Sequence, residues 1–435
     1  MNIVIVLFLL VLTVYFGYSI IKFMRLEVGS LFFKFALGFG VGFGAIYLLM
    51  IIIYAIGLEW NATLIFFPIF FISACGFIFS YKHHKRINIA KLSGKSTFLF
   101  ITIILLVGFV LFESTIRPLS AWDGWSSWQM RAKAMYLDQK ITTGQFAYFE
   151  TEYPLAVPLY SVFVYEILGE VDDTAILLVS FFFYAMIGLA AFSFLREKTS
   201  TNFAFLITFL LLSTQNIIRH GGRYESGMAD IVMSFFVLIT IILLHLALEK
   251  KSMMSLAFLL FVMALTSQIK NEGIVFSSIV FVVILYYAVI GRIARNWLLY
   301  LLYIVSMLVW PLLKEIYGLP GGILRSTPVL SVGIFVDVAK IQFLQYLNIQ
   351  NWNLGWVYLI TSTAYLIASK KINGVIIIIL AQLVVYLIIF LFSSVDPVTH
   401  AEGITDRLLI HIFPAATVMI SVFLYPMIKR QRFLN

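Results

Sequence analysis

The chain is organised around a polar, tryptophan-rich stretch, SAWDGWSSWQMRAKAMY (residues 120–136), which is followed by ETEYPLAVP (residues 150–158). Both stretches lie in one long connection, residues 113–173, that is rich in carboxylates. The segments on either side are apolar enough to lie in lipid. A polar connection of this size in such an apolar chain indicates a function, and we interpret that function as chemistry at a membrane surface.

The composition indicates an all-α, polytopic integral membrane protein. Hydrophobic residues make up 62% of the chain and charged residues 12%, whereas charged residues form about a quarter of a soluble protein. Apolar runs long enough to cross the bilayer as helices recur from end to end, and they predict about thirteen spans. These lie near 3–21, 31–57, 63–81, 97–112, 174–195, 202–218, 228–248, 253–268, 274–290, 297–313, 354–369, 374–393 and 408–427.

The short connections between these spans alternate in Lys and Arg content, which predicts the orientation of the chain. The basic connections contain residues 22–25, 82–86, 196–198, 250–251, 292–295, 370–371 and 429–432. We therefore expect them in the cytoplasm, with an external N-terminus and an internal C-terminus. Nearly all acidic residues then lie outside. The basic excess is explained by membrane insertion, so we expect membrane lipids and no nucleic acid as partners.

Two regions are predicted. Residues 1–95 form a three-helix membrane scaffold, and residues 96–435 form the functional module with its large external loop, 113–173. In that loop Ser120 or Asp123 can cap a helix that runs to about Gln139. Its tryptophan face, with Arg131 and Lys133 opposite, is typical of a helix in the membrane interface. Residues 153–168 are apolar but short, which favours a re-entrant or surface helix covered by protein or water.

Asp123 is the first candidate catalytic residue, because a carboxylate among Trp122, Trp125 and Trp128 is partly desolvated and suited to act as a general base. Its alternative role is a helix cap. Glu150 and Glu152 could orient Asp123 or the acceptor, or bind a divalent cation such as Mg²⁺ or Mn²⁺ with it. The alternative for both is a solvated loop carboxylate.

Charged residues at the starts or ends of later spans form a second group of candidates. Asp230 begins a span, where an acid is costly unless it faces a cavity; helix capping is its alternative. Arg223 follows Gly221 and Gly222, which would let the backbone approach a phosphate. Lys270 could bind a phosphate as a point charge, or could simply lie in a hairpin turn.

Arg407 and His411 stand four residues apart where the last span begins, so both side chains share one helix face. The Arg407 guanidinium could clamp a phosphate as a fork, with assistance from His411. A single arginine that extends from a helix end to the interface is the alternative. The sequence has no Gly-rich phosphate loop, nucleophile elbow or zinc-binding helix, so an ATP-driven pump is not expected.

Together these stretches resemble the GT-C superfamily of membrane glycosyltransferases, in particular the branch of protein O-mannosyltransferases and the lipid A aminoarabinose transferase. The resemblance spans residues 97–427 and lies in the order of five motifs: WDGW at 122–125 with RAKA at 131–134, YPLxxP at 153–158, GMAD at 227–230, KNEG at 270–273 and RLLxHxxP at 407–414. Gly124 departs from the family pattern, in which the loop acid is often one of a pair.

The resemblance implies transfer of a hexose or pentose from a polyprenyl-phosphate donor to a glycan, lipid or protein acceptor, on the extracytoplasmic face of the cell membrane. Asp123 would be the base, with Glu152 and Asp230 as further catalytic residues. Phosphate binding carries over to Lys270, Arg407, Arg223 and His411, and contact with sugar or acceptor to Trp122, Trp125, Tyr153 and Glu150. No certain cofactor is implied.

Three other functions fit parts of the sequence. A polysaccharide polymerase or ligase also uses prenyl-linked donors, but it would depend on arginines and a histidine and would not need Asp123. A secondary transporter of an anionic or lipid-linked solute would place Arg and Asp beside a cavity, usually near the midplane and in two related halves. A scaffold without enzymatic activity would leave the external charges without a task.

Overall fold

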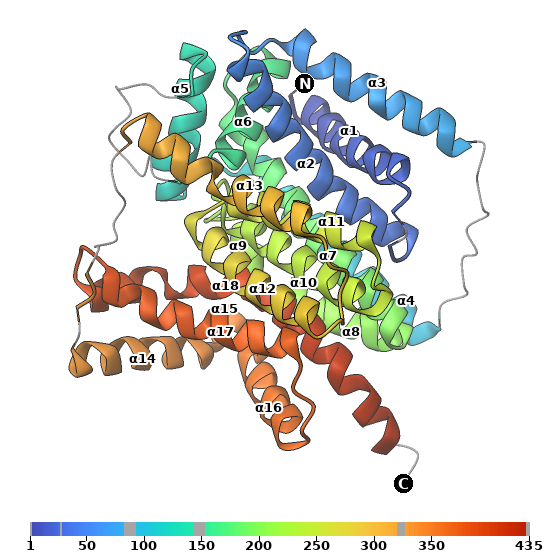
Figure 1. The fold of residues 1–435 in the computed structure, drawn as a ribbon, viewed down its shortest axis with the longest axis vertical. Coiled ribbons are helices and arrows are strands. Elements are labelled where there is room, and N and C mark those ends of the chain that lie inside the picture. Colours follow the sequence, from blue (N-terminus) through green and yellow to red (C-terminus); the bar gives the residue numbers. More distant parts are fainter. Residues whose placement is uncertain are drawn as a thin grey trace.

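The protein is all-helical over the residues that the computed structural model describes: 2–26, 28–81, 93–141, 153–319, 327–329 and 331–431. The helices, labelled in Figure 1, are α1 (Asn2–Phe23), α2 (Leu31–Ala55), α3 (Ala62–Tyr81), α4 (Gly94–Ile116), the π-helix η1 (Gly124–Gln129), α5 (Met130–Asp138), α6 (Ala156–Leu168), α7 (Asp173–Lys198), α8 (Thr201–Leu212), α9 (Gln215–Gly222), α10 (Asp230–Lys250), α11 (Met253–Ser267), α12 (Asn271–Val289), α13 (Trp297–Ile316), α14 (Val332–Tyr346), α15 (Ile349–Trp352), α16 (Gly355–Ala368), α17 (Gly374–Ile388), the 3₁₀-helix η3 (Ile389–Phe392) and α18 (Pro397–Gln431).

Nine helices in the described residues are long and apolar enough to cross a membrane. They are α1, α2, α4, α7, α10, α12, α13, α17 with η3, and α18; the pair α8 and α9, bent by 67°, makes a tenth if it is one span. Shorter apolar helices occupy Ala62–Ile78, Ala156–Leu168, Met253–Ser267 and Gly355–Ala368. A polytopic helical membrane protein therefore follows, whereas the count of thirteen spans remains a prediction.

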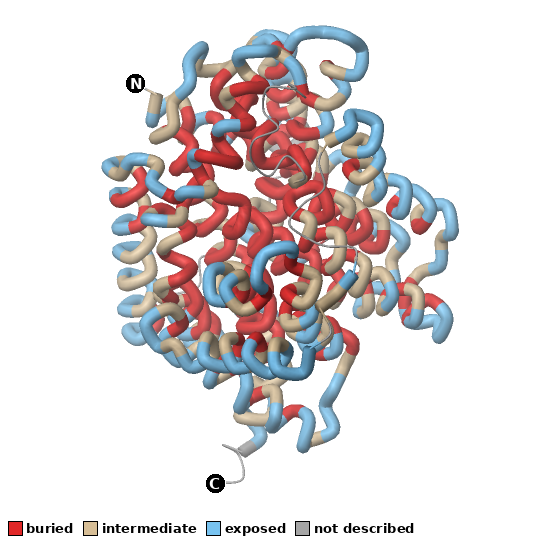
Figure 2. The backbone as a smooth tube through the Cα atoms, turned by 90° about the vertical axis from the view of Figure 1, so that its left-hand side faces the viewer, coloured by how far each residue is buried: buried red, intermediate tan, exposed pale blue. Residues whose placement is uncertain are grey.

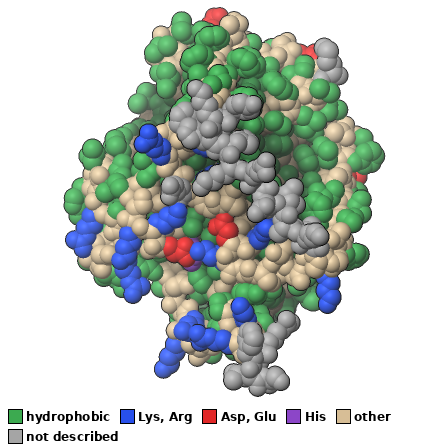
Figure 3. Space-filling model, turned by 90° about the vertical axis from the view of Figure 1, so that its right-hand side faces the viewer, with side chains coloured by type: hydrophobic (Ala, Val, Ile, Leu, Met, Phe, Trp, Pro, Cys, Tyr) green, Lys and Arg blue, Asp and Glu red, His purple; other side chains and the backbone are tan. Residues whose placement is uncertain are grey.

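The core of the bundle is formed by α10 and α18, whose most apolar windows are each 89% buried, whereas those of α4 and α13 are only 22% and 17% buried. Figure 2 shows buried backbone running through the middle of the molecule, with exposed turns around it. The face in Figure 3 is mostly hydrophobic, with acidic and basic side chains gathered near its middle. Apolar helices with exposed outer faces suit contact with lipid.

Glycines let α1 and α2 approach closely. A Cβ on Gly17 would collide with the carbonyl oxygen of Gly38, and a Cβ on Gly42 would collide with that of Thr13. Small residues at such positions allow van der Waals packing between helix backbones, which is a main source of helix association in membranes. The α1–α2 pair therefore depends on these glycines having no side chain.

The first two helices share the core with the predicted functional module. The hydroxyls of Thr13 and Tyr160 lie 2.9 Å apart, and the rings of Phe43 and Tyr160 stack with their centroids 4.7 Å apart. Tyr47 donates a hydrogen bond of 3.2 Å to Gln268, two residues before Lys270. Helices α1 and α2 are thus packed against the part of the chain that holds the candidate site, and the boundary at residue 95 remains a prediction.

Connections that the sequence assigns to one side of the membrane lie at one end of the bundle. Asn2 donates to Glu170 (2.6 Å) and Asp172 (2.9 Å) in the predicted external loop. At the other end Lys198, the last residue of α7, pairs with Glu249 of α10 at 2.7 Å. The start of the chain and the end of α18 lie toward opposite ends in Figures 1 and 2. The assignment of these ends to the cytoplasm and the exterior remains a prediction.

Candidate active site

Asp230, the first residue of α10, is the centre of the candidate site. Its side chain is 0% exposed, and its carboxylate accepts a hydrogen bond of 2.9 Å from Lys270 Nζ and one of 3.2 Å from an Arg407 amino group. His411 Nε2 lies 2.8 Å from Asp230 Oδ1. A buried carboxylate is tolerated only when it is paired in this way. Arg407 also donates to Asp123, and we call these five residues the Asp230 cluster.

Lys270 reaches the cluster from the tight turn between α11 and α12. It precedes α12 as its N-cap residue, and its side chain is 4% exposed. A Cβ on Gly273 would collide with the Thr266 carbonyl oxygen, so the turn is too close to α11 for a larger residue there. Glu272 Oε1 lies 3.4 Å from Lys270 Nζ. The Lys270 ammonium is therefore compensated by two carboxylates.

Arg407 and His411 project from neighbouring turns of α18 toward α10, as their spacing predicts. The two helices are also joined by the Ser234 hydroxyl, which donates to the carbonyl oxygen of Ile410 at 2.9 Å. The His411 side chain is 0% exposed, whereas that of Arg407 is 20% exposed. Arg407 is consequently the cation at the accessible edge of the cluster.

Asp123 approaches the cluster from the long loop, and it does not cap a helix. Its backbone is itself helical (φ −63°, ψ −28°), and its side chain makes no capping hydrogen bond. The carboxylate instead accepts from Arg407 and is 21% exposed. A six-residue π-helix, Gly124–Gln129, follows, and such π-helical turns are frequent at functional sites. The capping alternative for Asp123 is therefore not realised in the structure.

Tryptophans flank Asp123 at the surface. Trp122 is 63% exposed and Trp125 38% exposed, and their rings meet edge to face with centroids 4.7 Å apart. Trp128 is buried, and its ring centroid lies 5.1 Å from that of Tyr153. Trp122 and Trp125 are thus placed to contact a ligand at the cluster or the membrane interface.

The loop helix does not have the exposed basic face expected from the sequence. Arg131 is buried and donates to the carbonyl oxygen of Tyr153 at 2.9 Å, while Lys133 pairs with Asp173 of α7 at 2.7 Å. The expectation was wrong because the π-helix changes the rotation per residue before α5 begins. Tyr153, held by Arg131, lies with its ring centroid 5.6 Å from Lys270 Nζ and so belongs beside the cluster.

The apolar stretch 153–168 contains α6, which is covered by protein as its re-entrant or surface interpretation requires. Every residue of Ala156–Tyr165 is buried. The Ala156 N–H donates to the carbonyl oxygen of Gln268 at 3.2 Å, which joins α6 to the turn that holds Lys270. The loop and the Lys270 turn are thus one structural unit.

Arg223, predicted as a phosphate-binding residue, lies in a separate ion-pair group. Its Nε donates to Glu113 at 2.9 Å, and Arg117 donates to the same carboxylate at 2.5 Å. Both guanidiniums lie over the Tyr224 ring, at 4.9 and 4.7 Å from its centroid. The sequence analysis did not single out Glu113 or Arg117, although their i, i+4 spacing on α4 is a recognisable ion-pair signal.

A third group surrounds Glu225, in the connection between α9 and α10. Arg219 donates to Glu225, and His220 Nε2 lies 2.8 Å from its other oxygen. Burial alone would raise the pKa of Glu225, but His220 and Arg219 together hold that pKa below its ordinary value. Arg219 also lies 3.9 Å from Asp406, the neighbour of Arg407, so this group supports α18 next to the Asp230 cluster.

Glu150 and Glu152 lie outside the described residues. Among the residues that are described, no three His, Cys, Asp or Glu side chains are arranged to hold a metal ion. The divalent cation expected with Asp123 therefore remains a prediction.

The cluster as a whole presents one partly exposed carboxylate, Asp123, beside one partly exposed guanidinium, Arg407. Behind them lies a buried, compensated set of charges. This arrangement can accept a proton and stabilise an anion at neighbouring positions. Comparison of the chain with protein-family models, curated proteins and solved structures found no match.

Proposed function

We propose that the protein is a membrane glycosyltransferase that moves a hexose or pentose from a polyprenyl-phosphate donor to a glycan, lipid or protein acceptor at the extracytoplasmic membrane face. The observation that carries the proposal is the contact of Arg407 with both Asp123 and Asp230. This contact joins residues of the polar loop, α10 and α18 that the sequence analysis had singled out separately.

Asp123 is the acceptor-activating base in this proposal. Its Oδ2 accepts from Arg407, which fixes the carboxylate and leaves Oδ1 to accept a hydrogen bond from an acceptor hydroxyl. It is also the carboxylate of the cluster with partial exposure, since Asp230 is completely buried. A base must reach the proton that it removes, and this position satisfies that requirement better than Asp230.

Arg407 is the cation that faces the donor phosphate. It lies at the accessible edge, and its buried Nε has no hydrogen-bond partner within the described part of the chain. A guanidinium can bind two phosphate oxygens as a fork. Lys270 and His411 act mainly by holding Asp230, so we assign them to positioning of the site, with Lys270 adding positive charge behind Arg407.

The reaction balances without a further co-reactant. The acceptor oxygen forms a bond to the anomeric carbon of the sugar, while the bond from that carbon to the phosphate oxygen breaks. The electron pair stays on the departing polyprenyl phosphate, whose added charge Arg407 stabilises, and the acceptor proton moves to Asp123. Stabilisation of charge that develops in the transition state is usually the largest electrostatic contribution to catalysis.

Polymerisation or ligation of a prenyl-linked glycan is the second candidate. It is favoured by the Arg407–His411 pair on one face of α18, because catalysis by such an enzyme would depend on an arginine and a histidine. In that reaction Asp123 would be dispensable.

The proposal is tested by transfer from a panel of radiolabelled polyprenyl-phosphate sugars with the purified full-length protein. We compare wild type, Arg407→Ala and Arg407→Lys with Arg196→Ala, an exposed arginine at the other end of the bundle. We expect Arg407→Ala to weaken donor binding and transfer together, Arg407→Lys to retain part of both, and the control to match wild type. No transfer by wild type from any donor, with the protein folded, would reject the proposal.

A further inference from the structure

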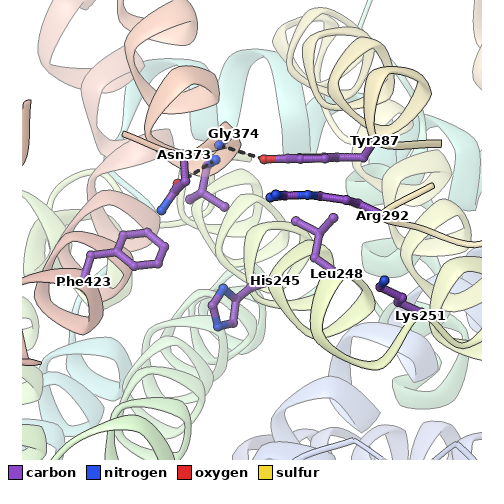
Figure 4. Close-up of a pocket in the computed structure, with 9 residues that line it drawn as sticks. His245, Leu248, Lys251, Tyr287, Arg292, Asn373, Gly374 and Phe423 are labelled. Atoms are coloured by element: carbon purple, nitrogen blue, oxygen red, sulfur yellow. Dashed lines mark hydrogen bonds between the residues drawn. The ribbon is translucent and has the colours of Figure 1, made fainter. Parts of the chain in front are cut away.

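Two adjoining cavities lie at the end of the bundle opposite the Asp230 cluster. The first, of about 380 Å³, is formed where α10, α12, α17 and α18 meet (Figure 4). The second, of about 420 Å³, lies between the connection that leads into α17 and the last turns of α18. Asn373 and Phe423 line both cavities, so the two adjoin and are considered together as one candidate site.

The charged side chains that line these cavities are basic. Lys251 and Arg292 line the first cavity, and Lys370, Lys371 and Arg430 line the second. Within the described residues neither cavity has an Asp or Glu in its lining. Uncompensated charge of one sign in a concave site attracts an anion.

The acid nearest in sequence does not neutralise this site. Glu249 accepts from Lys198 at 2.7 Å and lies 3.2 Å from His245 Nε2. It is thereby engaged by Lys198 and His245 and not by Lys251 or Arg292, and those two remain available to a ligand.

The anion would be held by side chains, because the first amides of α17 already have partners. Asn373 Oδ1 accepts from the amides of Val375 (3.0 Å) and Ile376 (3.1 Å). The Gly374 amide donates to the Tyr287 hydroxyl at 3.0 Å, the contact drawn in Figure 4. Figure 4 also shows the Arg292 side chain alongside that of Tyr287.

Apolar side chains also line both cavities, which distinguishes this site from one for a free anion. Leu248, Val375 and Phe423 line the first cavity, and Ile372, Pro426 and Met427 line the second. Cations next to an apolar wall match a molecule with an anionic head and a hydrocarbon tail. Basic pockets between membrane helices bind anionic lipid headgroups in this manner.

We propose that the two cavities bind the phosphate-containing headgroup of an anionic phospholipid. Lys251 and Arg292 hold the phosphate in the first cavity, Lys370, Lys371 and Arg430 extend the positive site, and the acyl chains lie along Phe423 and Met427. The proposal does not depend on the transferase activity, because no residue of the Asp230 cluster takes part.

The test uses the full-length protein in nanodiscs of phosphatidylcholine that contain increasing phosphatidylglycerol, with bound lipid counted by native mass spectrometry after transfer to detergent. The test variant is Lys251→Gln/Arg292→Gln. The matched control is Arg25→Gln/Arg196→Gln, which removes two exposed cations at the same end but outside the cavities. Thermal unfolding confirms that both variants are folded.

We expect wild type and control to retain phosphatidylglycerol in preference to phosphatidylcholine. The test variant should bind phosphatidylglycerol roughly 10- to 30-fold more weakly, the loss expected when two interfacial cations are removed. Equal retention of the two lipids by wild type, or equal loss in variant and control, would overturn the proposal. Binding of glycerol 3-phosphate as tight as that of phosphatidylglycerol would overturn it too, because a free phosphate would then be the ligand.

Discussion

Arg407 donates a hydrogen bond to Asp123 across a sequence separation of 284 residues. The same guanidinium reaches Asp230 on α10, so one side chain connects the polar loop to the two most buried helices of the bundle. The accessible acid and the accessible cation of the site therefore have fixed positions relative to each other.

Asp230→Asn should destabilise the protein by roughly 3–5 kcal/mol, because it removes a buried negative charge and leaves Lys270 with Glu272 and Arg407 with Asp123 as their remaining carboxylates. Thermal unfolding of the purified protein in detergent measures the change. Asp138→Asn, at an exposed position of α5, is the control and should unfold with wild type. A second variant, Asp230→Asn/Lys270→Met, should lose less than the sum of its single changes; strict additivity would mean that the two side chains do not interact.

Gly42→Ala should weaken the contact of α1 with α2, because the added Cβ collides with the Thr13 carbonyl oxygen. Overpacking of this kind costs typically 1–3 kcal/mol. Gly108→Ala on α4 is the matched control, since its Cβ would enter open space, and it should leave the unfolding temperature equal or slightly higher. If both variants unfold at the same temperature, the close approach of the two helices is wrong.

The effect of Glu225→Gln on stability should depend on pH. Because the pKa of Glu225 is lowered in the folded protein, its charged form contributes stability above the pKa of the unfolded chain, about 4.3. That contribution is lost as the pH falls through the folded-state pKa. The difference in unfolding temperature between wild type and Glu225→Gln should therefore be largest near pH 7 and shrink below pH about 4. A difference that stays constant over this range would contradict the pairing with Arg219 and His220.

The sequence singled out Asp230, Arg407 and His411 one by one, but it did not predict which residues they contact. Asp230 stood out because an acid that begins an apolar span is costly, and Arg407 and His411 because their spacing puts them on one helix face. Their meeting with Lys270 and Asp123 depends on how α10, α11, α12 and α18 pack, and spacing along the chain carries no information about that packing.

Two further details differ from what the sequence indicated, each for a local physical reason. The helical pattern after Asp123 assumes a constant rotation per residue, and the π-helix Gly124–Gln129 breaks that assumption and turns Arg131 inward. Arg223 was grouped with the phosphate-binding residues because of its glycine neighbours, and the structure adds a partner that the sequence did not indicate, Glu113 of α4. Its role in phosphate binding stays a prediction. The all-helical membrane fold itself was predictable, since the length and apolarity of each segment determine it.

The orientation of the chain is a separate prediction that cysteine labelling can test. In a Cys75→Ser background, Asp138→Cys should react with a membrane-impermeant maleimide in intact cells. Arg196→Cys, exposed at the other end, should react only after permeabilisation, because basic connections stay in the cytoplasm. The reverse pattern would invert the topology and move the Asp230 cluster to the cytoplasmic face.

Single-turnover transfer by Asp123→Asn at saturating donor tests the proposal that Asp123 removes the acceptor proton. Asparagine keeps the shape of the side chain and its capacity to accept from Arg407, but it cannot take a proton. We predict that the transfer rate falls by roughly 10²–10⁴-fold while donor occupancy stays close to that of wild type, and that Asp138→Asn transfers at the wild-type rate. Transfer by Asp123→Asn at the wild-type rate would contradict the assignment of Asp123 as the base and favour the polymerase or ligase.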